Sequence, residues 1–588
     1  MAWYSNSCFY HIYPLGMTGA PALNDYSEPV ERLNKLLPWI DHIQKIGCNA
    51  LYIGPLFESV GHGYETTDYK KLDSRLGTND TLKHFVKKCH EAGIKVIFDG
   101  VFNHTGRDFF AFKDLKANRE NSPYRDWYCN VNFWGNNEYN DGFSYDNWGG
   151  YNLLVKLNQK NPTVKQYICD VIRFWVSEFD VDGIRLDAAD VLDFEFMQDL
   201  RKTANQVKPD FWPMGEVIHG NYGRWVNENT LHSVTNYTMH KAFYSGHNDH
   251  NYFEIAHTLK YLSGMCGNSF MLYNFVDNHD VERISSKLTN KANYAPVHVL
   301  LYTMPGVPSI YYGSEFGIEG VKGHGTDAPL RPELPFEEYQ AKAADNPCVK
   351  LITALGHIRQ ETEELGYGEY KELLLTNRQY AFARNYQGSS VITTVNNDEN
   401  AATITVSAGN SAEYMGAISG VKVPVQNGSI TITLKANSGE IWRPADKYGD
   451  GAPKTDTTIV SWKAEEATVA EPVKGETKSN VEATVQEITK TTAQETEEPL
   501  PTVEPVKEEP TAPKATKEAP VTEPTPAQEE KKVEIPAGKS YEEMTIEELQ
   551  QVILGKMAKN GPVTDQMKKT VYDNTHHGSL ITWARSFQ

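Results

Sequence analysis

The sequence predicts an α/β protein with a parallel sheet, followed by a smaller antiparallel β domain. Up to about residue 361, apolar runs of strand length alternate with amphipathic runs of helix length, which is typical of parallel sheets. From residue 370 to 442 the pattern changes to short strands in which apolar and polar residues alternate. A chain of 588 residues is also too long for one domain, so we expect several.

The first part of the parallel sheet can be assigned element by element. Strands are predicted at residues 9–14, 50–54 and 94–98, and helices at 28–46 and from Asn79 or Asp80 to Ala92. The first helix is predicted because leucines and isoleucines recur three or four residues apart and a glycine follows them. The alternation by itself fits both an open doubly wound sheet and a closed barrel.

The second part continues the alternation. Helices are predicted at 161–179, 193–207 and 349–361, and a late strand at 307–312. Residues 292–313 contain no charged side chain, but three prolines and an internal glycine interrupt them. A buried helix, a turn and a strand explain that stretch better than a membrane span does.

Four of the strand-like runs end in acidic residues or histidines. They end at Asp99 and His104, at Asp187, at Glu216, and at His279 and Asp280. Arg185 and Asp187 share one face of a strand, and we expect the guanidinium to lower the pKa of the Asp187 carboxyl. An ordinary ion pair explains these two residues equally well. Four such runs in one chain favour a single site at the ends of neighbouring strands.

These runs resemble the signature regions of glycoside hydrolase family 13, the α-amylase family. The matching residues are 99–104, 183–187, 215–217 and 275–280, and the resemblance extends from about Phe9 to Pro444. It implies a (β/α)8 TIM barrel with Asp187 as nucleophile, Glu216 as acid/base and Asp280 as the acid that stabilises the transition state. It also implies that four further residues contact the sugar where the bond breaks, namely Tyr64, His104, Arg185 and His279.

The resemblance and the composition together predict five segments. They are a catalytic barrel (1–104 and 159–365), a domain B insert (105–158), a β-sandwich domain C (366–445), a disordered linker (446–540) and a small helical module (541–588). Residues 463–540 hold 17 Glu, 10 Lys and 10 Pro without an aromatic residue, which predicts disorder. Thr545 and Glu548 form a capping box, so a helix is expected after the linker.

Composition limits the partners and the compartment. The net charge of −20 argues against nucleic acid and anionic membranes as partners. The seven cysteines are widely spaced and include no CxxC pair, so we expect free thiols in a reducing compartment. The first residues lack the basic and apolar regions of a secretory signal. A cytoplasmic protein is therefore expected, with no partner predicted for the C-terminal module.

The order of the acidic residues indicates the chemistry. Asp187 and Glu216 end consecutive strands, and carboxyls about 5–5.5 Å apart imply a retaining, double-displacement glycosidase. Glu216 has Trp212 and Met214 nearby in sequence, so we expect it to have the raised pKa of a general acid. The resemblance implies the expected function, which is hydrolysis of α-1,4-glucosidic bonds in maltodextrins, with α-glucan oligosaccharides as substrates.

Two sequence details bear on the subgroup. Residues 154–158 resemble the fifth signature of the neopullulanase and cyclomaltodextrinase branch, although Val155 stands where a proline is usual. Residues 327–332 resemble α-glucosidases or oligo-1,6-glucosidases, an alternative that Lys156 argues against because those enzymes have an acid there. A non-catalytic relative is disfavoured because the acids are present. A glucan-binding or scaffold role is left open for the C-terminal module.

The resemblance also raises the question of calcium. Many α-amylases hold a structural calcium between domain B and the barrel, close to a lysine and a histidine that follow the nucleophile. Those positions are Ala189 and Asp190 here, and Asn103 is the only side-chain ligand that the motifs identify. Because calcium needs about 6–8 oxygen ligands, we predict no metal ligands and no required cofactor. We expect a preference for short or cyclic maltodextrins over starch.

Overall fold

The computed structural model describes residues 2–267, 271–323 and 326–449, and in the tail 545–546, 548–550 and 552–554. Eight parallel strands form one sheet in the order β11-β10-β9-β5-β2-β1-β13-β12. A parallel bridge between Thr235, just after β11, and Tyr273 of β12 joins the two ends of this sheet. The sheet is therefore a closed barrel, which confirms the predicted TIM barrel and decides against an open doubly wound sheet.

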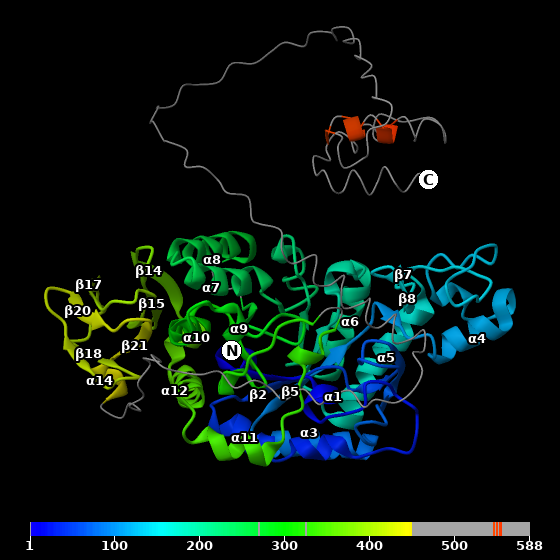
Figure 1. The fold of residues 1–588 in the computed structure, drawn as a ribbon, viewed down its shortest axis with the longest axis horizontal. Coiled ribbons are helices and arrows are strands. Elements are labelled where there is room, and N and C mark those ends of the chain that lie inside the picture. The colour runs from blue at the N-terminus through cyan, green and yellow to red at the C-terminus, as the bar shows by residue number, and fades with distance from the viewer. Residues whose placement is uncertain are drawn as a thin grey trace, which may run out of the picture. The chain divides into compact units, whose positions relative to one another are not determined.

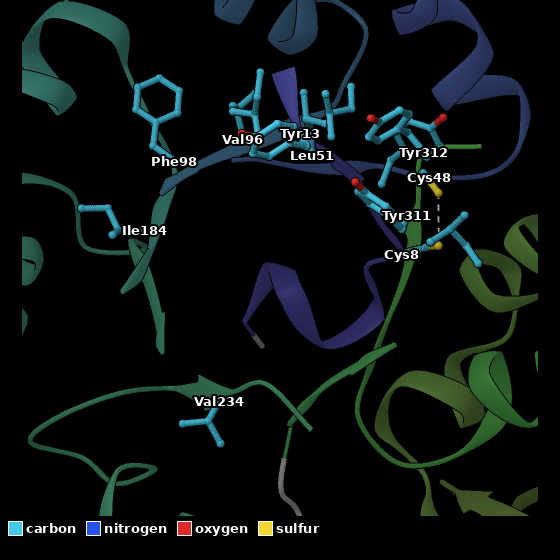
Figure 2. Packing of buried hydrophobic residues seen from close by; sticks show 14 of the residues in the cluster. Cys8, Tyr13, Cys48, Leu51, Val96, Phe98, Ile184, Val234, Tyr311 and Tyr312 are labelled. Atoms are coloured by element: carbon cyan, nitrogen blue, oxygen red, sulfur yellow. Dashed lines mark hydrogen bonds between the residues drawn. The ribbon is translucent and has the colours of Figure 1, made fainter. Parts of the chain in front are cut away.

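The barrel strands are short and almost entirely buried. They are β1 (Phe9–Ile12), β2 (Ala50–Ile53), β5 (Lys95–Gly100), β9 (Gly183–Leu186), β10 (Trp212–Gly215), β11 (Ser233–Val234), β12 (Tyr273–Phe275) and β13 (Val307–Tyr311). Burial on both faces is expected where helices cover the outside of a barrel and side chains fill its inside. Figure 2 shows part of this packing around Leu51, Phe98 and Ile184.

Helices connect these strands. The main ones are α2 (Trp39–Lys45), α3 (Asn79–Glu91), α5 (Pro162–Phe179), α6 (Phe194–Val207), α7 (Tyr237–Asn248), α8 (Tyr252–Cys266), α10 (Tyr294–Thr303) and α12 (Pro347–Glu361). Residues 292–313 form α10, a turn and β13, as predicted. In the described part of the chain, no helix is both long and apolar enough to cross a membrane.

The helix predicted over residues 28–46 is wrong in its length. The structure has a 3-10 turn at Arg32–Leu36 and a separate α2 that begins after Pro38. Proline lacks the amide hydrogen that a continuous helix would use, so the leucine spacing alone overstated the helix. The start of α3 also differs, because Thr78 caps it in a reciprocal pair with Thr81.

The barrel has an insert on one side and a β domain on the other (Figure 1). The insert contains α4 (Phe110–Asn118) and a three-stranded antiparallel sheet of β6 (His104–Thr105), β8 (Tyr151–Lys156) and β7 (Asn147–Trp148). It lies between β5 and α5 in sequence, where domain B was expected. The domain boundaries themselves stay predictions.

The C-terminal β domain is antiparallel, as predicted. Its larger sheet contains β14 (Glu369–Leu375), β15 (Gln379–Tyr386), β16 (Ser389–Asn396), β21 (Ser438–Pro444), β18 (Glu413–Gly416) and β19 (Lys422–Pro424). A second sheet pairs β17 (Ala402–Ser407) with β20 (Ser429–Leu434). The short helix α14 (Ala445–Tyr448) follows β21.

The linker and the tail lie largely outside the described residues. The predicted disordered linker (446–540) is described only to residue 449, and the helical module (541–588) only at eight positions. Those positions confirm the capping box, because the Glu548 amide donates to Thr545 Oγ1 at 3.3 Å and the Thr545 amide donates to Glu548 Oε2 at 2.7 Å.

The cysteines agree with the prediction of free thiols. All seven lie within the described residues, and no disulfide joins any of them there. Cys8 and Cys48 are buried beside each other, with their sulfurs 3.3 Å apart at hydrogen-bonding distance (Figure 2).

Candidate active site

The strand ends of the barrel surround a cavity of about 320 Å³. Five of the seven predicted site residues line it: Tyr64, His104, Asp187, Glu216 and Asp280. The other two, Arg185 and His279, lie directly behind them, and each is only 2% exposed. The structure therefore brings all seven residues together, although they come from segments more than 200 positions apart in the chain.

Arg185 connects three carboxylates. Its Nη1 donates to Asp99 Oδ1 at 2.9 Å and to Asp187 Oδ1 at 2.8 Å, and its Nη2 lies 2.8 Å from Glu216 Oε2. The strand register explains this arrangement, because Arg185 of β9 lies opposite Asp99 on one neighbour and Met214 of β10 on the other. The Asp187 and Glu216 side chains thus leave adjacent strands at the same level.

Burial controls the charge of this cluster. Burial raises the pKa of Asp187 well above its usual value. Arg185 opposes this shift, and the charges of Glu216 and Asp99 add to it. The lowered pKa predicted from the Arg185–Asp187 pair is therefore wrong, since burial of Asp187 and two neighbouring carboxylates outweigh one guanidinium.

Glu216 has two further hydrogen-bond donors. Its Oε2 accepts from the Ala188 amide at 3.1 Å, and its Oε1 accepts from the Tyr237 hydroxyl at 3.4 Å. Asn278 Nδ2 in turn donates to the Tyr237 oxygen at 3.1 Å. Tyr237 begins α7 and lies outside every recognised motif, so nothing in the sequence singled it out.

Asp280 is held by two cationic or polar partners. Arg331 Nη2 donates to its Oδ1 at 2.9 Å, and His279 Nε2 lies 3.0 Å from its Oδ2. Burial by itself would raise the pKa of Asp280, but His279 and Arg331 outweigh it and hold that pKa well below the usual value. Arg331 also donates to Asp327 Oδ2 at 3.1 Å. Both residues belong to the 327–332 motif, which was noticed only as a subgroup signal.

Tyr64 and His104 form another wall of the cavity. The Tyr64 hydroxyl lies 3.1 Å from Asp99 Oδ2 and 2.5 Å from His279 Nε2, and its ring is stacked on His279. His104 Nε2 is 3.1 Å from the Tyr64 carbonyl oxygen, and burial lowers the His104 pKa to about 3, so its imidazole is neutral near pH 7. Trp148 of the insert lies with its ring centre 6.0 Å from that of His104.

Two family models match the chain in consecutive segments. One, described as the catalytic domain of α-amylase, matches residues 33–364, and the other, described as the α-amylase C-terminal domain, matches residues 368–442. The chain belongs to the α-amylase family. It is an α-amylase-family glycoside hydrolase, as the signature regions predicted.

Several relatives narrow the comparison. Cyclomaltodextrinase from Thermoanaerobacter pseudethanolicus is 33% identical over 419 residues, which are 67% of this chain and 71% of that protein. Neopullulanase 2 from Thermoactinomyces vulgaris is 30% identical over 423 residues, 70% of each chain. A solved cyclomaltodextrinase structure matches with a TM-score of 0.66 at 26% identity, covering 75% of this chain and 78% of its own. The predicted resemblance to this branch of the α-amylase family is confirmed.

The residues of this α-amylase-family hydrolase do not fit the calcium site that the family suggests. Asn103 Oδ1, the expected ligand atom, accepts a hydrogen bond from Gln159 Nε2 at 3.1 Å. Gln159 Oε1 accepts from the Asp193 amide at 2.6 Å. Within the described ranges no group of three or more His, Cys, Asp or Glu residues is placed to hold a metal.

Proposed function

We propose that this chain hydrolyses α-1,4-glucosidic bonds in maltodextrins with retention of configuration, using Asp187 as nucleophile and Glu216 as acid/base. One observation carries the proposal: a single buried guanidinium, that of Arg185, lies 2.8 Å from a carboxylate oxygen of each residue at the wall of the cavity. Strands in a sheet lie about 4.8 Å apart, which supports the short carboxyl separation of retaining enzymes.

The first chemical step needs one proton on the pair. Glu216 donates it to the glycosidic oxygen while an Asp187 oxygen bonds to the anomeric carbon and the leaving chain departs. The raised pKa of Asp187, caused by burial and opposed by Arg185, favours binding of a proton beside the glycosidic bond. In the second step Glu216 takes a proton from water, and the water oxygen replaces Asp187 at the anomeric carbon.

The remaining predicted residues position the sugar. The ionised Asp280 carboxylate accepts hydrogen bonds from hydroxyls of a distorted ring and opposes the positive charge that develops there. Arg185 orients Asp187, His104 provides a polar group at the cavity wall, and His279 lies 3.0 Å from Asp280 behind that wall. The Tyr64 ring supports the apolar face of the sugar. Held by two hydrogen bonds, it is fixed in position before substrate binds.

The substrate class is proposed from the residues that line the cavity and from the relatives. Trp148 and Lys156 of the insert and Asp190 of the loop after β9 line the cavity. The relatives named cyclomaltodextrinase and neopullulanase support short or cyclic maltodextrins as substrates in preference to starch. A cytoplasmic location is supported by the cysteines, none of which is paired in a disulfide within the described chain. No partner is proposed for the C-terminal module.

A product profile tests the proposal. Purified enzyme is incubated with cyclodextrin, maltoheptaose, pullulan and soluble starch, and the anomer of the first product is read by proton NMR. Release of α-anomeric maltose and maltotriose, fastest from cyclodextrin or maltoheptaose, is expected. A β-anomeric first product would refute retention. Release of glucose alone from chain ends would indicate the α-glucosidase alternative.

A further inference from the structure

The insert displays an indole to solvent. The Trp134 side chain is 98% exposed, whereas every other tryptophan in the described part of the chain is buried or partly buried. Exposing so large an apolar ring without a partner is unfavourable, because water is ordered around it. Such a residue on a well-packed segment therefore indicates contact with a ligand.

Trp134 projects from a rigid frame and not from a loose loop. The backbones of Asn132 and Ser144 exchange two hydrogen bonds of 2.8 and 3.0 Å just before it, and Phe133 packs inward against Phe143 with ring centres 5.6 Å apart. Phe133 and Trp134 are the central residues of a turn that the Gly135 amide closes on the Asn132 carbonyl at 3.1 Å, and in this turn Phe133 packs inward while Trp134 faces solvent.

Two arginines fix the turn of the same hairpin. Arg107 donates to both carboxylate oxygens of Asp141 at 2.8 Å. Arg119 donates to the carbonyls of Asp141 and Gly142 at 3.0 and 2.9 Å, and its guanidinium lies 5.3 Å from the Phe133 ring centre. The backbone that carries the indole is thus held in place, which reduces the entropy lost when a ligand stacks on it.

The size of this surface indicates the class of ligand. A single indole offers on the order of 200 Å² of apolar area, whereas a stable protein interface needs about 800 Å² per partner. One flat aromatic face matches the apolar face of one or two sugar rings. The side chains of Asn132 and Asn140 are exposed on the same hairpin, and their amide groups can bond sugar hydroxyls.

We propose that Trp134 is the stacking platform of a second α-glucan-binding site, on the insert and outside the catalytic cavity. The ligand class rests on the proposed function. The hairpin that carries Trp134 starts at Cys129. The Cys129 amide donates a hydrogen bond of 3.1 Å to the carbonyl of Lys156, which lines the cavity. Five extended residues reach at most roughly 17 Å, so a long glucan chain can contact the platform and the cavity together. A short oligosaccharide occupies the cavity alone.

Binding is tested by gel retardation in amylopectin, with all variants made in an Asp187→Asn background so that the gel is not digested. Trp134→Ala is expected to weaken retardation by about tenfold in apparent Kd, and Trp134→Phe by less. The matched control is Tyr261→Ala, which removes a half-exposed aromatic ring from α8 and is expected to leave retardation unchanged. A gel with a β-glucan should retard none of these proteins.

Kinetics in the otherwise wild-type enzyme give a second readout. Trp134→Ala should raise KM for amylopectin while kcat and the turnover of maltotriose stay as in wild type. Unchanged amylopectin binding in Trp134→Ala would overturn the proposal. A change in sedimenting mass would also overturn it, by placing the indole between two copies of the chain. If Trp134→Ala loses binding but the wild type hydrolyses no α-glucan, the platform stands and the proposed function fails.

Discussion

At the scale of single residues, Arg185 determines what the site can do. One guanidinium holds Asp99, Asp187 and Glu216, and the three carboxylates differ in exposure, with the Glu216 side chain at 13% and that of Asp99 at 0%. Asp99 therefore serves as a structural partner of Arg185, while Asp187 and Glu216 face the cavity. This division of roles among three similar acids follows from where each side chain meets solvent.

The Asp187→Asn variant tests the nucleophile. An amide cannot form the covalent glycosyl intermediate, so kcat on maltoheptaose should fall by more than about a thousandfold, equivalent to at least ~4 kcal/mol of barrier lowering. Circular dichroism and the melting temperature should show that the fold is retained. A variant that keeps more activity than this would show that Asp187 is not the nucleophile.

The Arg331→Met variant tests the charge of Asp280. Burial opposes ionisation of Asp280, and Arg331 is one of the groups that keep its pKa low. Removing the arginine raises that pKa, so the acidic limb of the kcat/KM profile should move to higher pH while the alkaline limb stays in place.

Lys322→Met provides the matched control for Arg331→Met. Lys322 pairs with Asp327 at 3.3 Å and lowers the Asp280 pKa less than Arg331 does, so its removal should give a smaller shift in the same direction. A profile of Arg331→Met that overlays the wild type would show that Asp280 does not need to be ionised. In the wild type, the ion pair between Asp280 and Arg331 stabilises the fold fully at pH values above the ordinary pKa of an aspartate. That contribution is lost as pH falls through the lowered pKa of Asp280.

At the scale of elements, the contact between the insert and the barrel bears on whether a calcium ion can bind there. Gln159 lies between Asn103 at the end of β5 and Asp193 before α6, and both Asn103 and Gln159 are buried. A neutral amide bridge takes up the oxygen that a cation would use. Calcium binding at this place would require Gln159 to move and leave a buried amide unpaired.

Chelation and one substitution test this join. EDTA dialysis should leave the melting temperature unchanged. Gln159→Ala should lower it by several degrees, because two buried polar groups lose partners at about 1–3 kcal/mol each. The control is Asn158→Ala, which removes an exposed hydrogen bond to the Asp126 carbonyl and should change the melting temperature little. A melting temperature that falls after EDTA dialysis and recovers when calcium is added would contradict the prediction.

At the scale of the whole molecule, the catalytic unit ends later than the last strand. Glu364 is fully buried, and its carboxylate is bound by Lys447 Nζ at 2.9 Å and by the Tyr448 hydroxyl, both in α14. Helix α14 follows β21 directly, so it belongs to the same folded unit as domain C.

Two truncations test where this unit ends. A chain that stops after Gly449 should fold and hydrolyse maltoheptaose at the full rate, because every predicted site residue and the partners of Glu364 are kept. A chain that stops after Pro444 should melt at a lower temperature, since it leaves a buried carboxylate without partners. Loss of activity in the longer truncation would show that the C-terminal segment takes part in catalysis.

Local patterns were enough to predict much of this molecule. Strand period placed Arg185 and Asp187 on one face, and the apolar runs that end in acids or histidines contain six of the seven residues that the structure brings together around the cavity. Strand alternation and the residues at strand ends depend only on nearby positions in the chain, so the sequence spacing is enough to predict them. The capping pair of Thr545 and Glu548 was predicted on the same basis, from residues three positions apart.

Contacts between distant residues had to come from the tertiary structure. Barrel closure depends on Thr235 meeting Tyr273, and the donor to Glu216 comes from Tyr237, for which no motif exists. The pKa of Asp187 is raised because burial and two neighbouring carboxylates outweigh one arginine. Spacing along a chain cannot report burial or the sum of charges around a point, since both depend on which segments the fold brings together.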